Sequence, residues 1–421
     1  MVSRLILGVS LSLLAATAYT PPALANDGRT LQIIVSRDAQ SLVVYNGDQV
    51  VATSKVSTGK PGHSTPTGIF SILEKKKYHE SNLYSNAPMP YMQRITWSGV
   101  ALHESNHVPN YPASHGCVRM PGKFAKALFQ MTQRGAHVII TDEPVVPVAF
   151  SHSNLFKPHN PLIEEQLMSD AELRPTTPDP VLRPVELAMN EVLPKLGATA
   201  TAVIEDMPPI RILITRRGAR EAMIDAQTLL NTLGYAAGDV DGQAGSVTIA
   251  AINAFKTANN LPAKGELLSP EFMAALYKAA GKGTPPSGQI LVRQKFKPII
   301  EAPVVIDQPE VALGTLFFEA TDVMRTAGKV EWHALSLDNH LSEQQMKRLG
   351  ITESADAKDP DLLSKTLDRI RIPDDVRRKI ETLLSDGSSL TIADVGLGSE
   401  TGQGTDFITL TKKTPKGKSK S

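Results

Sequence analysis

Proline is concentrated in one stretch of this chain, and that stretch divides the sequence into two parts. Eleven of the 30 prolines fall within residues 144–209. Proline lacks a backbone N–H and clashes with the preceding helical turn, so few regular elements tolerate this density. The stretch predicts a proline-rich extended connector over residues 144–215, with one helix near residues 184–196. Folded domains are therefore expected on both sides of it.

The first 25 residues have the three parts of a secretory signal peptide. Arg4 provides the positive charge, residues 5–18 form an uncharged apolar run, and residues 23–25 form a small-x-small cleavage site. The run is too short to span a bilayer comfortably, which favours cleavage over a membrane anchor. We expect a mature chain that begins near Asn26, lies in the periplasm and has no membrane span.

Overall charge excludes a polyanion-binding protein. Lys and Arg total 44 against 43 Asp and Glu, so the net charge is +1 and no nucleic-acid partner is expected. Lysines are dense only in residues 412–421. A solvated basic tail is the favoured interpretation of this end, ahead of a contact with an anionic surface.

Residues 27–143 have the pattern of a mainly β domain with one helix. Short apolar runs at 31–35, 41–45, 49–52, 69–73 and 138–141 predict strands, and Asn46-Gly47 predicts a hairpin turn. Apolar residues at helical spacing predict a helix over 123–134, which Gly135 ends.

Residues 216–282 predict a small three-helix bundle. Helical periodicity covers 221–233, 247–258 and 270–280, and Ser269 with Pro270 is a typical helix start.

Residues 283–411 predict a C-terminal α/β or β-rich unit of unknown role, which we expect to be non-catalytic. Strand-like runs occur at 315–319 and 330–336, and a helix is expected over 374–384. Strands at 389–393 and 407–411 are expected to pair across the glycine-rich residues 395–404. The fold class is therefore multidomain.

Cys117 is the only cysteine, so it cannot form an internal disulfide. In an exported protein it is either an intermolecular partner or a reactive thiol. A nearby imidazole can generate the nucleophilic thiolate, and His103 and His115 both qualify. In an extended segment, His115 and Cys117 would project to the same side. Gly116 allows close backbone approach, and its N–H with that of Cys117 could stabilise an oxyanion.

Two other interpretations of these residues remain open. His103, His107, His115 and Cys117 could ligate zinc, but the prolines around His107 indicate a loop, where the His-x3-His spacing loses its value. Cys117 could also be a buried, inert thiol. We expect no metal and no cofactor.

Several separated motifs carry a family resemblance. Leu102-His103 and the segment Ser114-His115-Gly116-Cys117-Val118-Arg119 resemble the signature of the L,D-transpeptidase (YkuD-type) family. Residues 57–62 and 65–70 resemble the segments that precede the active site in that family, so the resemblance covers roughly residues 30–142.

The resemblance implies a catalytic domain and assigns roles within it. It makes Cys117 the nucleophile and His103 the base, and it places Ser114, His115 and Gly116 at the oxyanion site. Arg119 is implied to contact substrate, and we add Tyr91 and His107 as expected walls of the substrate cleft. Glu104 departs from the commoner small residue, at a position where the family orients the base through a backbone carbonyl.

Residues 220–280 resemble a peptidoglycan-binding module. The matching residues include Ala226 to Tyr235, Asp241 to Gly245 and Phe255, with Lys256 where glutamine is usual. Pieces of the C-terminal third, such as Trp332 and residues 400–407, resemble a region of certain proteobacterial L,D-transpeptidases.

Together these resemblances imply a wall-associated acyltransferase that acts on peptidoglycan stem peptides. Cys117 would attack the bond between the L-centre and the terminal D-alanine of a tetrapeptide stem. The thioester would pass to an amine, giving a 3→3 cross-link or attaching an outer-membrane protein to the wall. An L,D-carboxypeptidase and a catalytically silent wall-binding scaffold are the alternatives, and a sortase-like enzyme is disfavoured. Sensitivity to carbapenems is also implied.

Overall fold

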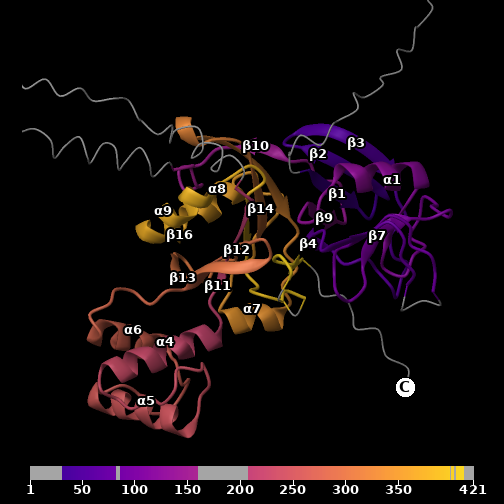
Figure 1. The fold of residues 1–421 in the computed structure, drawn as a ribbon. Coiled ribbons are helices and arrows are strands. Elements are labelled where there is room, and N and C mark those ends of the chain that lie inside the picture. Colours follow the sequence, from indigo (N-terminus) through magenta and orange to yellow (C-terminus); the bar gives the residue numbers. More distant parts are fainter. Residues whose placement is uncertain (1–30, 82–85, 160–206, 399, 403, 412–421) are drawn as a thin grey trace, which may run out of the picture.

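The structure is a computed structural model that describes residues 31–81, 86–159, 207–398, 400–402 and 404–411 (Figure 1). The expected signal peptide, the helix near 184–196 and the basic tail lie outside these residues. No helix in the described ranges is long and apolar enough to cross a membrane. The fold is multidomain and rich in sheet, with a separate helical bundle, as the sequence predicts.

The N-terminal domain contains two sheets and one helix. Its six-stranded sheet has the order β18-β4-β9-β1-β2-β3, and its four-stranded sheet has the order β5-β6-β7-β8. The strands of the first are β1 (Gln32–Ser36), β2 (Ser41–Asn46), β3 (Gln49–Lys55), β4 (Gly68–Ser71), β9 (His137–Thr141) and β18 (Thr409–Leu410). Those of the second are β5 (Glu74–Lys76), β6 (Met92–Arg94), β7 (Ala101–Glu104) and β8 (Val118–Met120), and the helix is α1 (Gly122–Met131). The strands and the helix expected in this part of the chain are confirmed, with ends shifted by a few residues.

The central strands of the six-stranded sheet are buried on both faces. Ile33 and Val35 of β1 pack into the core beneath α1, whereas Ile34 points to the opposite face. Successive side chains of a strand alternate between faces, so a strand covered on both sides reads as an unbroken apolar run. This explains why residues 33–35 and 138–140 are apolar without alternation.

The C-terminal domain is an eight-stranded sheet of order β10-β15-β14-β17-β11-β12-β13-β16 with helices packed on it. Its strands are β10 (Val148–Phe150), β11 (Ile210–Arg216), β12 (Gly288–Gln294), β13 (Lys297–Ile306), β14 (Thr315–Met324), β15 (Lys329–Leu337), β16 (Ile370–Arg371) and β17 (Ser389–Ala393). Its helices are α7 (Glu343–Leu349), α8 (Leu362–Asp368) and α9 (Asp374–Leu383), with a 3-10 turn, η1, at Arg325–Ala327.

Two strands of this sheet come from the stretch that we expected to be a connector. β10 pairs with β15, and β11 pairs with both β12 and β17. The prolines within 144–159 and 207–215 flank these strands without interrupting them, and Ile210–Arg216 is buried throughout. Each end of the expected connector is therefore part of the sheet.

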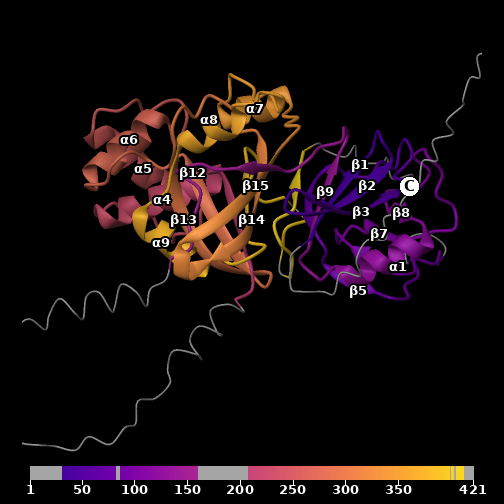
Figure 2. The same ribbon diagram turned by 90° about the horizontal axis from the view of Figure 1, so that it is seen from above.

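The three expected helices are confirmed as α4 (Ala219–Thr232), α5 (Ser246–Ala258) and α6 (Pro270–Ala279). Because β11 and β12 pair directly, the bundle is an insertion between two neighbouring strands. Figures 1 and 2 both show it on the far side of the eight-stranded sheet from the N-terminal domain. Buried Gln227 binds Asp241, Gln243 O, Thr248 and Gly242 N, which holds the glycine-rich loop against α4. Buried Lys256 donates to Glu266 O at 3.0 Å, so it too has a structural contact.

The two domains pack sheet against sheet (Figure 2). The shared apolar cluster contains Ile34, Tyr45, Ile69 and Ile139 of the N-terminal domain with Phe317, Leu335 and Leu337 of the C-terminal domain. The outer face of the six-stranded sheet is thus covered by β14 and β15.

The expected pairing of 389–393 with 407–411 is wrong. β17 is a central strand whose two edges are taken by β11 and β14. The last strand, β18, instead pairs antiparallel with β4, with Thr409 opposite Ile69. The end of the C-terminal domain therefore completes the N-terminal sheet.

Candidate active site

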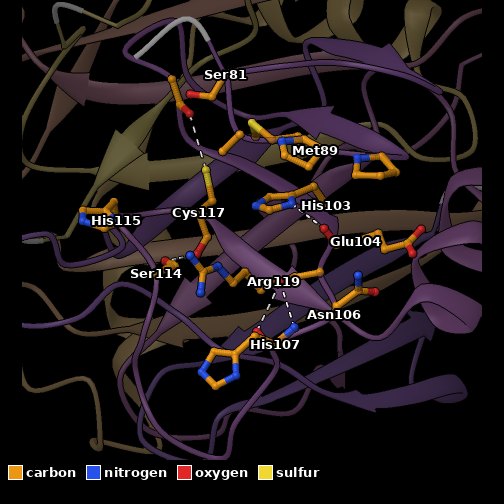
Figure 3. A pocket seen from close by; sticks show the side chains of 15 residues that line it. Ser81, Met89, His103, Glu104, Asn106, His107, Ser114, His115, Cys117 and Arg119 are labelled. Atoms are coloured by element: carbon orange, nitrogen blue, oxygen red, sulfur yellow. Dashed lines mark hydrogen bonds between the residues drawn. The ribbon is translucent and has the colours of Figure 1, made fainter. Parts of the chain in front are cut away.

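The parallel pair of β7 and β8 brings the principal predicted residues together. His103 is opposite Arg119 in this pair, and Cys117 directly precedes β8. Val118 and Met120 point into the core, so Cys117 and Arg119 share the opposite face with His103. Figure 3 shows these three side chains around one pocket.

A tight turn presents Cys117. The Ser114 hydroxyl donates to Cys117 O at 2.5 Å and accepts from Gly116 N at 3.1 Å. Gly116 has φ of +114°, a conformation in which a side chain is strained. Ser114 therefore supports the turn.

Two expectations for this turn need correction. The segment is not extended, and exposed His115 turns away from the thiol to contact His63, with ring centroids 4.7 Å apart. His115 is therefore not placed to act as a base. The Gly116 N–H already donates to Ser114, so it is not available as an oxyanion donor in this geometry.

Residues 57–65 enclose the turn from the other side. Ser57 and Arg119 exchange two backbone hydrogen bonds of 3.0 Å, and Lys60 N donates to Ser114 O. The Thr65 hydroxyl donates to Gly116 O and accepts from Gly59 N, each at 2.8 Å. A Cβ at Gly59 would lie only 2.0 Å from His63 O, so glycine is required there. The motifs that are distant in sequence thus form one structure around Cys117.

The hydrogen bond of His103 fixes its tautomer. Nδ1 lies 2.7 Å from Glu104 O, and because a carbonyl only accepts, Nδ1 carries the hydrogen. The lone pair is then on Nε2, the nitrogen that can accept a proton. Burial lowers the pKa of His103 to about 4, and the nearby Arg119 charge acts in the same direction. His103 is therefore a neutral imidazole near neutral pH.

Cys117 rests as a neutral thiol. Burial raises its pKa, although a backbone hydrogen bond to Ala101 and the charges of Arg119 and Arg94 oppose this effect. Its Sγ donates to Gly99 O at 3.6 Å. The thiol and the imidazole thus share a pocket without being an ion pair in the resting state.

The pocket has a volume of about 500 Å³. Of the predicted substrate-contacting residues, Arg119 and His107 line it. Tyr91 does not, because its ring packs edge-on against Phe129 of α1, with centroids 5.7 Å apart. The sequence did not identify the apolar wall formed by Pro88, Met89 and Pro90, nor Gly99, since short segments without periodicity carry no signal of their position.

The alternative metal site has no geometric support in the described residues, where no three His, Cys, Asp or Glu side chains lie close enough to hold an ion. His115 points away from the other three candidates.

Sequence comparisons match two segments of the chain. Residues 31–140 match the YkuD family, described as "L,D-transpeptidase catalytic domain", and residues 219–276 match a family described as "Putative peptidoglycan binding domain". A relative from Bacillus subtilis, "Putative L,D-transpeptidase YqjB", is 29% identical over 150 residues, which cover 31% of this chain and 84% of the relative.

Solved structures give similar matches. An L,D-transpeptidase from Mycobacterium smegmatis is 23% identical with a TM-score of 0.26, and the match covers 27% of this chain and 59% of that one. An L,D-transpeptidase from Xylanimonas cellulosilytica is 26% identical with a TM-score of 0.25, and the match covers 27% of this chain and 60% of that one. The chain thus spans about three fifths of the length of these structures. From the two family matches, the chain contains a YkuD-family L,D-transpeptidase catalytic domain and a peptidoglycan-binding domain.

Proposed function

We propose that this protein is a cysteine-dependent peptidoglycan L,D-transpeptidase. The observation that carries the proposal is the placement of Cys117 and His103 on one face of the β7–β8 pair, beside a pocket, with Nε2 as the nitrogen that can accept a proton. A thiol nucleophile and its general base must face one substrate pocket in this way.

The first half-reaction forms a thioester. Cys117 Sγ attacks the carbonyl carbon of the bond between the L-centre and the terminal D-alanine, and its proton passes to His103 Nε2. The carbon–nitrogen bond breaks, and His103 returns the proton to the departing amine of D-alanine. Backbone amides of the cysteine turn other than that of Gly116 are the candidates for stabilising the oxyanion.

The second half-reaction releases the enzyme. An acceptor amine attacks the thioester and gives a proton to His103, the carbon–sulfur bond breaks, and the thiolate recovers that proton. A stem-peptide amine gives a 3→3 cross-link, an amine on an outer-membrane protein gives wall attachment, and water gives L,D-carboxypeptidase activity. Arg119 supplies positive charge for the carboxylates of the stem.

Burial of both groups determines when the thiol is activated. The pKa of the thiol is raised and that of the imidazole is lowered, so proton transfer between them is unfavourable before substrate binds. We infer that the proton moves during attack, when negative charge develops on the substrate oxygen rather than on sulfur.

The peptidoglycan-binding domain supports peptidoglycan as a partner and an extracytoplasmic, wall-associated location. Its position on the far side of the eight-stranded sheet separates it from β7 and β8, the strands beside the pocket that Cys117 lines. The domain would therefore bind peptidoglycan at a distance from the stem peptide that reacts with Cys117.

The test is incubation of the mature chain with purified tetrapeptide muropeptides, followed by mass spectrometry, with Cys117→Ala as the control. Dimers that have lost one D-alanine and require Cys117 establish cross-linking. Tripeptide monomers alone indicate carboxypeptidase activity or a missing protein acceptor. An absence of turnover favours the silent scaffold, a second candidate that the raised pKa of the buried thiol supports.

A further inference from the structure

A carboxylate from the C-terminal domain contacts the loop beside the candidate nucleophile. Oε2 of Glu400 accepts hydrogen bonds from Trp97 N at 3.1 Å and Ser98 N at 3.4 Å. Two successive backbone amides that converge on one oxygen form a small anion-binding nest. Hydrogen bonds to an ionised acceptor are roughly twice as strong as neutral ones.

The amides that Glu400 binds belong to the turn between β6 and β7. Within this turn, Gly99 N donates to Thr96 O at 3.3 Å, and Val100 N donates to the Thr96 hydroxyl at 3.0 Å. The internal hydrogen bonds thus converge on Thr96. The amides of Trp97 and Ser98 are satisfied instead from the C-terminal domain.

The same turn touches the thiol. Gly99 O accepts from Cys117 Sγ at 3.6 Å, and Gly99 lines the pocket. A continuous series of contacts therefore runs from the Glu400 carboxylate, through the turn of residues 96–100, to Sγ. Because a carbonyl that accepts from S–H stabilises the protonated thiol, the placement of Gly99 O affects how readily the thiol ionises.

Glu400 is held in position by contacts on its own segment. β18, a few residues further on, pairs with β4, and Arg134 of the N-terminal domain donates to Gly404 O at 3.2 Å. The carboxylate is thus presented to the turn from a segment that is tied to the N-terminal sheet.

We propose that Glu400 is a positioning residue for Cys117, acting through the turn of residues 96–100. The proposal rests on the proposed function, because it assigns Glu400 a role in preparing the nucleophile of that reaction. The C-terminal domain then contributes to the active site.

The charged and titratable groups around the thiol limit what else can produce the expected effect. Arg119 and Arg94 influence its ionisation, and His103 lies on the same face. The hydrogen bonds of Glu400 go to Trp97 and Ser98 and not to any of these three groups. If the pH dependence of Cys117 alkylation changes when Glu400 is substituted, the change therefore reports on the turn of residues 96–100.

The experiment measures the rate of Cys117 alkylation by iodoacetamide between pH 6 and 10, in the full mature chain. Cys117 is the only cysteine, so no other thiol contributes to the signal. For Glu400→Ala we expect the inflection to move to lower pH and alkylation at pH 7 to accelerate about two- to tenfold, the range that the loss of one hydrogen bond gives. Glu400→Gln keeps an uncharged acceptor and is expected to give an intermediate shift.

Glu331→Ala is the matched control. It removes an exposed carboxylate of the same domain, on β15, and leaves the contacts of residues 400–404 in place, so we expect a wild-type alkylation profile. If Glu400→Ala matches the wild type, or if Glu331→Ala gives the same shift, the proposal is wrong. Should Glu400→Ala not fold, Glu400→Gln alone decides, because a wild-type profile for it also overturns the proposal.

Turnover of tetrapeptide stems is measured on the same variants. We expect Glu400→Ala to lower kcat with little change in KM, and Glu400→Gln to restore part of kcat. A shifted alkylation profile in a protein that never turns over stems would retain the positioning role and reject the transpeptidase. Normal turnover of stems with an unchanged alkylation profile would retain the transpeptidase and reject the positioning role.

Discussion

Glu319 gives this protein an unusual dependence of stability on pH. It lies on β14 on the same face as Phe317, which packs against His137 of the N-terminal sheet with ring centroids 4.8 Å apart. Only 1% of Glu319 is exposed, and its Oε1 has no hydrogen-bond partner among the residues that the structure describes. Burial raises its pKa to about 8, although nearby Arg211 acts in the opposite direction. The side chain is therefore mostly protonated in the folded protein at pH 7.

The sign of the effect follows from proton binding in the two states. In the unfolded chain a glutamate ionises with a pKa of about 4.3, so between that value and about 8 the folded state binds the extra proton. The contribution of Glu319 is complete below the unfolded pKa and is lost as the pH rises towards 8. Buried His103 and His137 have lowered pKa values, so they destabilise only as the pH falls below about 6.5.

Between pH 6.5 and 8, the change in unfolding free energy therefore comes from Glu319 and not from the two buried histidines. One proton corresponds to about 1.4 kcal/mol per pH unit, so the wild type should lose about 2 kcal/mol of unfolding free energy across this window. Glu319→Gln has nearly the same shape and no ionisable proton. We expect its stability to change little there, so the difference between the two proteins grows by about 2 kcal/mol.

The assay is guanidinium unfolding at several pH values, followed by the fluorescence of Trp332. This tryptophan is buried in the same sheet as Glu319. The control is Glu331→Gln, which alters an exposed glutamate on neighbouring β15. Parallel stability curves for wild type and Glu319→Gln from pH 6.5 to 8 would show that Glu319 is already ionised in the folded state and would refute the reasoning.

Four further outcomes are expected. Wild type should form a covalent carbapenem adduct, seen by intact-mass analysis, and Cys117→Ala should form none; an adduct on the variant would reject Cys117 as the nucleophile. Arg119→Ala should raise KM for tetrapeptide stems about tenfold or more, as expected when a charged contact is lost, with partial recovery in Arg119→Lys; an unchanged KM would remove Arg119 from substrate binding. Gly116→Ala should cost about 1–3 kcal/mol of stability in denaturant because of its positive φ, and a wild-type midpoint would contradict that strain. A fragment of residues 31–143 should aggregate or unfold more readily than the full chain in light scattering, because it exposes the face containing Ile34 and Ile139 and lacks β18; a stable monomer would contradict this.

The sequence predicted local structure well where the pattern was local. The helices at 219–232, 246–258 and 270–279 follow from apolar periodicity and from the Ser269 cap, whose hydroxyl accepts from Phe272 N. The juxtaposition of His103 and Cys117 was anticipated through a motif, although the motif does not contain the β7–β8 pairing that explains it.

Long-range pairing was not predictable from the sequence, and the reasons are physical. A strand's partner depends on which sheet edge is free, and residues 389–393 have the composition of a strand whether they are central or at an edge. The connector was misjudged because strand prolines are tolerated at strand ends, so proline density did not exclude β10 and β11. His115 was misplaced because the positive φ of Gly116 breaks the alternation that an extended segment would have.

Two carboxylates of the C-terminal domain act on the N-terminal domain in opposite physical ways. Glu319 is buried and uncharged beneath the six-stranded sheet, where ionisation would weaken the contact between domains. Glu400 lies on the segment that leads to β18. It accepts hydrogen bonds from the backbone amides of Trp97 and Ser98, a kind of contact that is strong when the acceptor is ionised. Raising the pH towards 8 therefore weakens the packing of the two sheets. If the domains separate under these conditions and β18 leaves β4, the contact of Glu400 with Trp97 and Ser98 is lost, because β18 and Glu400 belong to one segment. Alkylation of Cys117 should then change in parallel with unfolding above pH 8, and Glu319→Gln should delay both changes together.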